Sequence, residues 1–499
     1  MRIEVKTKID NKIRIETKNL SRSILKELKD EFRHHNPDFF KAKNMGRWVG
    51  GTPSKIVTFE LEDDGKIITI PRGGEGSWNK IALNNFIKED RSIEVCQEPA
   101  KYQWKSGLKL WPFQKEAVDI ILARKNSLIL GGTSSGKTII ALAAIAASGM
   151  KAGIIVPNRI LFDQWLEVIE ERLGIPRKDI GKVGGGHKFK IGDQITVMMQ
   201  KSAYNKIKEL KNLFGFICLD ECHRCAARTF LEVMDSFNAR YRLGVTATVK
   251  RNDGKHFLTY DMFGPVCFEI KKEFLREEGY VTPVELHVIK TDFYFDYLRE
   301  DFFQDLHDNE VIDLDLMDVD SKEKYCKKRG LPTNNYNEYL GEIHKDDARN
   351  NLIFKYVKKE YDEKNKSLIF SRRREYCEVW EEALARKGID MAIFWGGGGN
   401  KEKRRVQEDV LRMRDGKLMI GMGTIVDEGV SLPIVKVGFV TYRNAKNFGQ
   451  LTQQEGRFAR LFEGQTRGRL YYFWDHKITR FKKDIKLLKK VFKEIIIYG

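Results

Sequence analysis

The stretch SLILGGTSSGKTIIALAAIAAS, residues 127–148, decides the fold of this chain. Its first apolar run predicts a strand and its last predicts a helix, with a loop of small residues between them. The loop GGTSSGKT, Gly131–Thr138, fits the spacing G-x-x-x-x-G-K-[ST]. In such a loop, backbone N–H groups and the positive end of the helix bind phosphate oxygens. We therefore expect Lys137 to reach the β- and γ-phosphates of a nucleotide and Thr138 to ligate Mg²⁺.

A pair of carboxylates supplies the second half of a nucleotide site. FGFICLDECH, residues 214–223, is an apolar strand that ends in Asp220 and Glu221. Open α/β sheets bind their ligands at the carboxyl ends of the strands. We expect Asp220 to hold Mg²⁺, through water, and Glu221 to orient and activate the attacking water. A phosphate-binding loop followed by this pair predicts a nucleoside triphosphatase.

Apolar runs alternate with amphipathic helical stretches around these motifs, which is typical of βαβ units and a parallel sheet. Two such series predict an α/β fold with parallel-sheet domains at residues 101–278 and 279–478. A small α+β domain is expected at 1–100 and a basic helix at 479–499, with a helix on a membrane surface as the alternative for the latter. For the acidic insert at about 295–340, a solvated helical segment and a regulatory or DNA-mimicking segment are both open.

Charge and composition restrict the function further. The 499 residues include 89 Lys and Arg and 71 Asp and Glu, for a formal net charge of +18. A polyanion explains this excess, and nucleic acid is the first candidate partner. No apolar run is long enough to span a membrane, and the first residues lack the apolar core of a signal peptide. Seven cysteines favour a reducing cytoplasm over a disulfide framework.

Two further motifs suggest a link between nucleotide and movement. LGVTAT, residues 243–248, ends in Thr246 and Thr248, which we interpret as a relay from the nucleotide site. QQEGRFAR, residues 453–460, places Arg457 and Arg460 on one helical face. In the second domain of a triphosphatase such arginines supply positive charge to the γ-phosphate; a solvated basic face is the alternative. We interpret His223 as a link between its loop and the facing domain.

In this order the motifs resemble those of the superfamily 2 helicases. WPFQ resembles the Q-motif, in which the glutamine, here Gln114, reads adenine. The other likenesses are AGIIVPNRILFDQW to motif Ia, VMMQKS to the next DNA-backbone motif, DECH to motif II, TAT to motif III, SLIFSRR to motif IV, GTIVDEGVSLP to motif V and QQEGRFAR to motif VI. The resemblance spans roughly residues 110–475. It implies two tandem RecA-like domains and an ATP hydrolase coupled to DNA unwinding, with ATP and Mg²⁺ as cofactors.

The motifs and the resemblance together give a set of expected site residues. The catalytic ones are Lys137, Glu221, Arg457 and Arg460, and Arg460 is favoured as the arginine finger. The nucleotide-binding ones are Gln114, Gly131, Gly132, Thr133, Ser134, Ser135, Gly136, Lys137, Thr138, Asp427 and Glu428, and the metal-holding ones are Thr138 and Asp220. The strand-contacting ones are Pro157, Arg159, Gln200, Ser202, Arg372 and Thr424, with a plain surface charge as the alternative for Arg159. The coupling ones are His223, Thr246, Thr248 and Gln453.

Within the superfamily the chain most resembles the phage UvsW-type helicases. Three stretches carry this likeness: NPDFFKAKNMGRWVGG, residues 36–51; KVGGGHK, residues 182–188; and TATVKRNDGK, residues 246–255. The resemblance implies branch migration, fork regression and unwinding of junctions or R-loops in DNA recombination, replication and repair. It also implies the host cytoplasm if the chain is phage-encoded. Motif V departs from the superfamily at Gly423, where Ser or Thr is frequent, so Thr424 is expected to take the backbone role.

The N-terminal domain is expected to choose the substrate. Basic Lys41, Lys43 and Arg47 suit phosphates, and Phe39, Phe40 and Trp48 suit stacking on unpaired bases. The alternative is that these aromatic side chains form the core of a small domain. Two other functions stay open for the whole chain. One is a duplex translocase, and the other is a nucleic-acid-binding ATPase switch without strand separation; RNA is open as the substrate.

Overall fold

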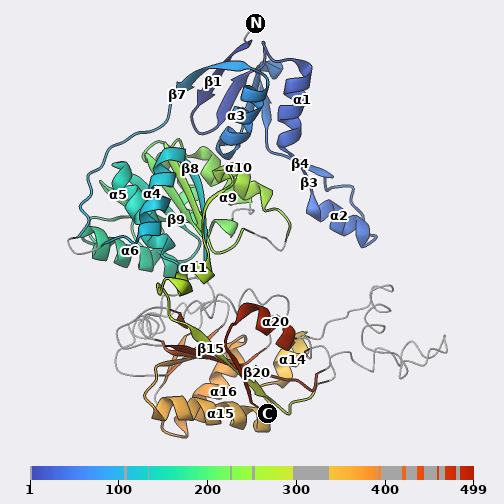
Figure 1. Cartoon of the computed structure of the whole chain (residues 1–499), viewed down its shortest axis with the longest axis vertical. Coiled ribbons are helices and arrows are strands. Elements are labelled where there is room, and N and C mark those ends of the chain that lie inside the picture. The colour runs from blue at the N-terminus through green and yellow to red at the C-terminus, as the bar shows by residue number, and fades with distance from the viewer. Residues whose placement is uncertain are drawn as a thin grey trace, which may run out of the picture. The chain divides into compact units, whose positions relative to one another are not determined.

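The computed structural model describes residues 3–105, 109–132, 134–224, 228–249, 253–295, 336–389, 391–394, 418–422, 435–442, 458–459, 467–478, 481 and 484–498. The chain divides into two compact units, Met1–Phe274 and Leu275–Gly499 (Figure 1). Among the described helices, none combines the length and the apolar character needed to cross a membrane.

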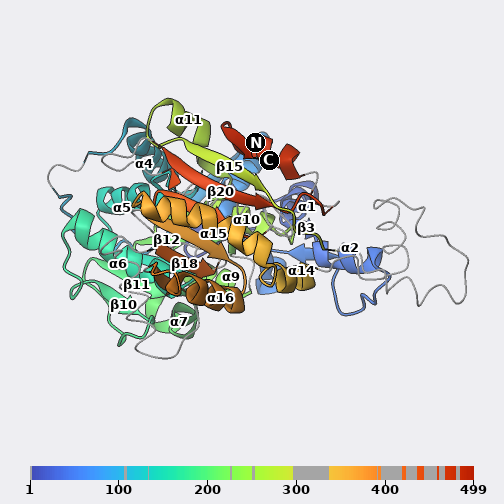
Figure 2. The ribbon, with the colours of Figure 1, turned by 90° about the horizontal axis from the view of Figure 1, so that it is seen from below.

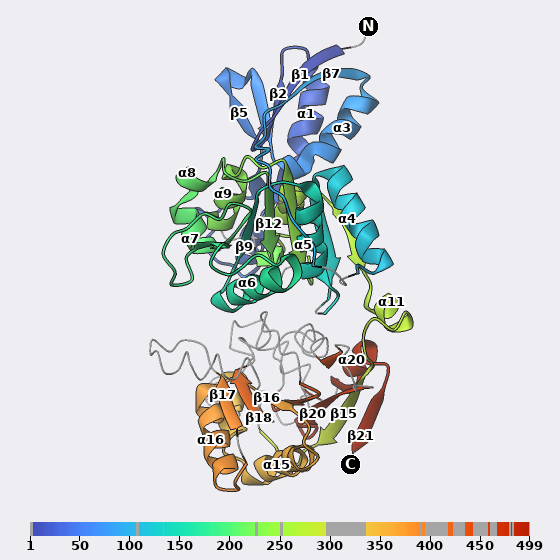
Figure 3. The same ribbon diagram turned by 90° about the vertical axis from the view of Figure 1, so that its left-hand side faces the viewer.

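The first unit begins with a five-stranded sheet in the order β5-β6-β2-β1-β7. Its strands are β1 (Ile3–Ile9), β2 (Ile13–Glu16), β5 (Glu60–Glu62), β6 (Ile67–Ile70) and β7 (Ile87–Ile93). Helices α1 (Arg22–Glu31) and α3 (Glu75–Asn84) lie together beside this sheet (Figure 3). Alternation along β1 and β2 turns Val5, Ile13 and Ile15 into a core with Leu28 and Trp78. This is the small α+β domain that the sequence predicts.

The second sheet of this unit is parallel throughout, in the order β10-β11-β9-β12-β13-β8-β14. Its strands are β8 (Asn126–Gly131), β9 (Ala152–Val156), β10 (Gly181–Val183), β11 (Ile195–Met199), β12 (Phe216–Asp220), β13 (Tyr241–Thr246) and β14 (Val266–Ile270). Strands β9, β12 and β13 are buried at every position, as expected for a sheet covered on both faces. The predicted parallel α/β architecture is confirmed here.

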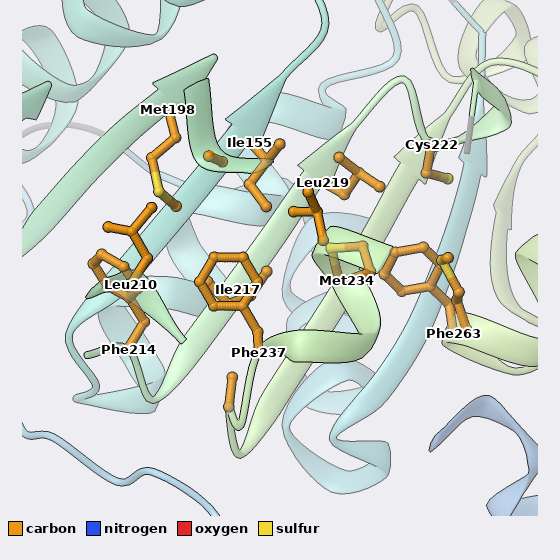
Figure 4. Close-up of a cluster of buried hydrophobic side chains, with 14 of the residues drawn as sticks. Ile155, Met198, Leu210, Phe214, Ile217, Leu219, Cys222, Met234, Phe237 and Phe263 are labelled. Atoms are coloured by element: carbon orange, nitrogen blue, oxygen red, sulfur yellow. The ribbon is translucent and has the colours of Figure 1, made fainter. Parts of the chain in front are cut away.

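Helices separate the strands of this sheet. They are α4 (Pro112–Arg124), α5 (Lys137–Ser148), α6 (Arg159–Leu173), α7 (Gln200–Asn205), α8 (Ile207–Leu210), α9 (Arg228–Ser236), α10 (Phe257–Phe263) and α11 (Lys272–Glu277), with the 3₁₀ turn η3 (Cys222–Arg224) after β12. In the core, Ile155 of β9, Met198 of β11 and Leu219 of β12 belong to one cluster with Phe237 and Phe263 (Figure 4). This packed core fixes the positions of the strands, and so it also fixes where the loops at their ends begin.

Two buried arginines join the N-terminal sheet to the parallel sheet. A guanidinium N–H of Arg242, on β13, donates to the Asn11 carbonyl at 2.7 Å. Arg72, in the 3₁₀ turn η2 (Arg72–Gly74), donates to the Asp10 carbonyl and, at 3.4 Å, to the Ala239 carbonyl. Burial lowers the pKa of Arg242 to about 9 and that of Arg72 to about 10. The N-terminal sheet is thus part of the same body as the first parallel sheet.

The second unit contains another parallel sheet, in the order β17-β18-β16-β19-β20-β15-β21. Its strands are β15 (Val284–Lys290), β16 (Ser367–Ser371), β17 (Met391–Phe394), β18 (Leu418–Met422), β19 (Val437–Val440), β20 (Gly468–Trp474) and β21 (Ile495–Tyr498). Its helices are α14 (Tyr336–Glu342), α15 (Asp347–Asp362), α16 (Arg374–Ala385) and α20 (Asp484–Val491). Helix α16 lies beside β18 (Figure 2). This is the second predicted parallel-sheet domain.

The C-terminal stretch differs from the helix expected over residues 479–499. Helix α20 covers Asp484–Val491, and the chain then forms strand β21 at Ile495–Tyr498. Three consecutive isoleucines favour an extended chain, and the open edge of β15 gives them a partner. The lysines that precede the isoleucines repeat at helical spacing, so the sequence predicted one continuous helix and not the strand. Most of the predicted acidic insert, residues 296–335, lies outside the described residues.

Candidate ATP site and nucleic-acid interface

The phosphate-binding loop follows β8 and leads directly into α5. Its backbone takes left-handed conformations at Ser134 (φ +65°) and Gly136 (φ +84°), which wind the loop tightly before the helix starts. The Lys137 Nζ donates to the carbonyls of Gly131 at 2.6 Å and Gly132 at 2.9 Å. The ammonium therefore folds back over the loop, at the place where phosphate oxygens bind in such loops. Thr138 is half-buried in the first turn of α5.

Gln114 lies against this loop from the first turn of α4. Its Oε1 accepts the Trp111 N–H at 3.0 Å, which caps the helix. Its Nε2 faces Gly136 so closely that a Cβ at that position would lie only 2.6 Å away. Glycine is needed at 136 both for its conformation and for this contact. Gln114 and the loop, 17 or more residues apart in sequence, thus form one structure.

The two carboxylates lie at the carboxyl end of β12, which β13 separates from β8 in the sheet. Asp220 is buried, and its two oxygens accept hydrogen bonds from the Trp165 indole N–H and the Glu221 backbone N–H, both at 2.9 Å. Burial and the Glu221 charge raise the pKa of Asp220 to about 6. Glu221 has φ +51°, an uncommon conformation for a residue other than glycine. Trp165 is a site residue that sequence patterns did not indicate.

The residues expected to couple the site to movement form a connected chain. The His223 Nδ1 lies 3.2 Å from Glu221 Oε2 and 3.0 Å from Thr246 Oγ1. Thr246 Oγ1 donates to the Thr248 carbonyl at 2.9 Å and accepts the Thr248 N–H. The expected relay from the Glu221 carboxylate to the end of β13 would pass through these two side chains, and it stays a prediction. His223 thus has a partner within its own unit, Thr246, and the expected link to the facing domain stays a prediction.

These residues suit a magnesium nucleotide. The loop has no side chain at Gly131, where a Cβ would meet Ser135 Oγ at 2.6 Å, so the loop packs closely on itself. A buried carboxylate and a threonine hydroxyl are the hard oxygen donors that Mg²⁺ prefers. Lys137 adds the positive charge that a γ-phosphate requires. The nucleotide-binding and metal-holding roles of the individual residues remain predictions.

Two of the residues that we expect to contact a nucleic-acid strand, Arg159 and Ser202, lie beside a turn of three glycines. Gly184, Gly185 and Gly186 all have positive φ, between 63° and 91°. A Cβ at Gly184 would lie 2.2 Å from Ser202 Oγ, and one at Gly186 would lie 3.3 Å from an Arg159 guanidinium nitrogen. Only glycines allow this approach. Pro157 follows β9 and Gln200 follows β11, so both also lie at the carboxyl ends of strands.

Arg159 is held at this turn by several neighbours. Its Nε donates to Asp163 at 2.7 Å, and its Nη2 lies 3.3 Å from His187 Nε2. The His187 ring stacks on Phe162, and burial and the Arg159 charge lower the pKa of His187. Sequence patterns did not single out His187. Arg159 itself is exposed, so its free face points to solvent beside the glycines.

The segment Asn36–Gly51, which we name the arm, is exposed at most of its positions. Helix α2 (Pro37–Asn44) has no buried residue and extends away from the five-stranded sheet (Figure 1). Trp48 is 85% exposed, and its ring packs on the backbone of Gly50, where a Cβ would lie 2.2 Å away. Phe40 is 38% exposed. The core alternative is therefore wrong for Trp48 and Phe40. Lys41, Lys43 and Arg47 are exposed as well.

The residues at the two ends of the arm contact the parallel-sheet part of the same unit, and we call them the root of the arm. Strands β3 (Arg33–His35) and β4 (Lys55–Val57) frame it. His34 Nε2 and Thr58 Oγ1 lie 2.9 and 2.7 Å from Asp261 Oδ2, on α10. Lys255 Nζ donates to Asp38 at 2.6 Å. The arm thus attaches to the segment that follows Thr248 in the chain.

Several expected residues lie outside the described part of the chain: Thr133, Thr424, Asp427, Glu428, Gln453, Arg457 and Arg460. Arg372 is described and half-buried directly after β16 in the second unit.

Several known proteins are similar to this chain. The family described as Type III restriction enzyme, res subunit, matches residues 107–251. The DNA 3'-5' translocase XPB2 of Sulfurisphaera tokodaii is 26% identical over 399 residues, which cover 76% of this chain and 86% of that protein. The probable helicase D10 of Escherichia phage T5 is 26% identical over 339 residues, which cover 68% of this chain and 65% of that protein. The crystal structure of T4 UvsW covers 99% of both chains at 17% identity, with a TM-score of 0.40.

A phosphate loop and a carboxylate pair on the edge of a parallel sheet, followed by a second parallel sheet, define an ATP-hydrolysing motor enzyme. The ordered motifs and the matching relatives make this motor a DNA helicase that is similar to the superfamily 2 helicases.

Proposed function

We propose that this helicase acts on DNA and remodels branched substrates, by branch migration, fork regression or unwinding of junctions and R-loops. The arm carries the proposal. Trp48, Phe40 and three basic side chains lie exposed on one short segment that is fixed at its root. Exposed aromatic rings stack on unpaired bases, and unpaired bases occur where DNA strands part. The relatives named as DNA translocases and helicases support DNA as the substrate.

In the proposed cycle, Lys137 exchanges its bonds to the Gly131 and Gly132 carbonyls for the phosphates of ATP. Glu221 accepts a proton from the attacking water, and Arg457 and Arg460 stabilise the transferred phosphoryl group. Mg²⁺, held by Thr138 and Asp220, would neutralise charge on the β- and γ-phosphate oxygens. Gln114, beside Gly136, would read the adenine. The proposed chain from Glu221 through His223 to Thr248 then carries the change in the site toward the strand ends.

The tracked strand is proposed to cross the carboxyl ends of β9 and β11. There Arg159, Ser202 and the backbone N–H groups of the glycine turn offer donors to phosphates. The net charge of +18 supports this role because each phosphate contact with a cation strengthens binding at low salt. Arg372 and Thr424 are the proposed counterparts in the second unit.

The arm is best tested by a point change, because deletion of residues 1–100 would remove the Asn11 carbonyl that binds the buried Arg242 guanidinium. Trp48→Ala removes an exposed ring and is expected to leave the melting temperature unchanged. Phe86→Ala is the matched control, because Phe86 is 78% exposed in the same N-terminal body but lies outside the arm. ATP-driven displacement is measured on a Holliday junction, a fork, an R-loop and a linear tailed duplex.

We expect Trp48→Ala to lose the preference for branched over linear DNA by about 10-fold, since one base stack is worth about 1–3 kcal/mol. Phe86→Ala should keep that preference. An unchanged preference in Trp48→Ala would place branch recognition outside the arm. Turnover on DNA without any strand displacement would favour the duplex translocase or the ATPase switch, and equal activity on RNA would change the substrate class.

A further inference from the structure

One buried hydrogen bond of the candidate ATP site joins two residues that are far apart in sequence, and no sequence motif predicted it. The Trp165 indole N–H donates to Asp220 Oδ2 at 2.9 Å, and the two side chains are 1% and 6% exposed. The other oxygen of Asp220, Oδ1, accepts the Glu221 backbone N–H. Each carboxylate oxygen is therefore held by one donor, and its orientation is fixed from two directions.

The chemistry of the donor suits a carboxylate that must bind a cation. An indole N–H only donates, has no charge and does not titrate. Lysine or arginine in the same place would compete with a metal ion for the carboxylate, whereas tryptophan orients it and leaves its charge available. A carboxylate oxygen has more than one lone pair, so each oxygen keeps acceptor capacity beside its N–H partner.

Trp165 also connects two functional regions, because it lies on α6. That helix begins at Arg159, capped by the Asn158 side chain, which accepts the Leu161 N–H at 2.9 Å. Trp165 lies six positions after Arg159 in the helix, which is about 9 Å along the axis. A helix of this length moves as a rigid rod, so a shift at its strand-contacting end displaces the indole as well.

We propose that Trp165 is a positioning residue that fixes the Asp220 carboxylate for Mg²⁺ and ties it to the strand-contacting end of α6. The inference rests on the ATP site proposed above. It predicts that the loss of the indole N–H weakens metal binding while nucleotide binding without metal stays intact. It also predicts that a bound strand strengthens metal binding through this contact, since such coupling acts in both directions.

The first test is Trp165→Phe in the full chain, which keeps an aromatic ring and removes the N–H. Trp78→Phe is the matched control, because Trp78 is also fully buried and also donates its indole N–H to a carboxylate, that of Glu89. A fluorescent ATP analogue is bound to each protein in EDTA and then titrated with Mg²⁺. Lys137→Ala is measured in parallel.

We expect Trp165→Phe to bind the analogue normally in EDTA but to need about 10–100 times more Mg²⁺, the usual cost of losing a partner of a metal ligand. Trp78→Phe should match the wild type. An unchanged Mg²⁺ requirement in Trp165→Phe would overturn the inference. If Lys137→Ala also binds the analogue like the wild type, the ATP site itself is misplaced, so the two failures are distinguishable.

A single-stranded oligonucleotide tests the link through α6. It should lower the Mg²⁺ requirement of the wild type and of Trp78→Phe, but not that of Trp165→Phe. An equal decrease in all three proteins would contradict the link. If Trp165→Phe does not fold, 5-fluorotryptophan placed at position 165 of the otherwise unchanged chain reports on the same contact. Its ¹⁹F resonance should move when Mg²⁺ is added to the nucleotide complex, and a stationary resonance would overturn the inference.

Discussion

The carboxyl edge of the first parallel sheet and the arm are two polar regions of one unit, and they are built in opposite ways. At the edge, Asp220, Glu221 and Lys137 are all engaged with other groups of the protein. In the arm, Trp48 touches little beyond the backbone of Gly50, and the basic side chains extend into solvent. The edge consists of side chains that bind one another and the backbone, whereas the arm consists mainly of exposed side chains.

This difference matches the two tasks proposed for the molecule. Phosphoryl transfer depends on charges and donors held in place before the reaction. Recognition of a branch point has to tolerate many sequences, which favours exposed aromatic stacking and phosphate contacts. We therefore expect substitutions at the edge to change rates by orders of magnitude and substitutions in the arm to change substrate preference.

The largest effect on ATP turnover is expected from Arg457 and Arg460, the arginines that would add positive charge to the ATP site. Arg460→Ala should lower ATP turnover by about 10³–10⁵-fold, the usual contribution of an arginine finger, while DNA affinity stays near normal. Arg457→Ala is expected to affect ATP binding more than the finger variant does. Steady-state ATPase and filter binding to DNA separate the two effects. Turnover within a few-fold of wild type in both variants would make these residues a solvated basic face.

The next largest effect distinguishes the phosphate-binding loop from the carboxylate pair. Lys137→Ala and Glu221→Gln should each lower turnover by about 10²–10³-fold or more, as when a preorganised group that stabilises the transition state is removed. Only Glu221→Gln should still bind ATP, because its amide keeps the shape of the side chain. It should also trap a closed complex with DNA. Normal hydrolysis in either variant would show that the ATP site has been assigned to the wrong residues.

Most of the fold could be predicted from the sequence because its strands are short apolar runs with motifs at their ends. The runs at 127–132, 152–157, 214–221 and 241–248 correspond to β8, β9, β12 and β13. Strand β14 escaped prediction because Val266–Ile270 is only half-buried and carries Glu269, so it lacks an apolar run. Strand β21 escaped because the lysines before it suggested one continuous helix.

The site could be predicted only as far as motifs reach. The loop, the carboxylates and the two threonines each belong to a pattern in sequence. Trp165 and His187 lie within stretches that resemble the family, but no pattern predicted their contacts, because their partners Asp220 and Arg159 lie 55 and 28 residues away in the chain. The sequence also left open whether Trp48 is a core residue, since a tryptophan beside glycines suits either role. Its exposure of 85% follows from the arm's lack of a covering element.

The pH dependence of metal binding provides a sharper test of the edge. Asp220 has an ordinary pKa of 3.8 and a pKa of about 6 in the fold, raised mainly by burial. The carboxylate becomes protonated as the pH falls through about 6, so Mg²⁺ must then displace a proton. We expect Mg²⁺ affinity of the nucleotide complex to fall by up to about tenfold per pH unit below that point, and to level off above it. The same titration without protein corrects for protonation of the nucleotide. A flat profile between pH 5 and 7 would mean that Asp220 does not hold the metal.

The smallest effect should come from His223. This residue lies beside Glu221, and we propose that it couples the ATP site to DNA binding without taking part in hydrolysis. Its Nδ1 lies between Glu221 Oε2 and Thr246 Oγ1, at 3.2 and 3.0 Å. His223→Ala keeps the loop and both carboxylates, so basal ATPase should stay close to wild type. The stimulation of ATPase by DNA should fall by about 5-fold or more, the scale of a typical coupling between two sites.

His256→Ala is the control for this change, since His256 is an exposed histidine of the same unit that lies outside the chain of contacts. It should keep full stimulation. Thr246→Val removes the hydroxyl that receives the contact, and combining it with His223→Ala should add little to either change alone, because the two side chains act in series. Additive losses would show that they act independently. Basal ATPase that falls together with stimulation would instead place His223 among the groups that position Glu221 for reaction.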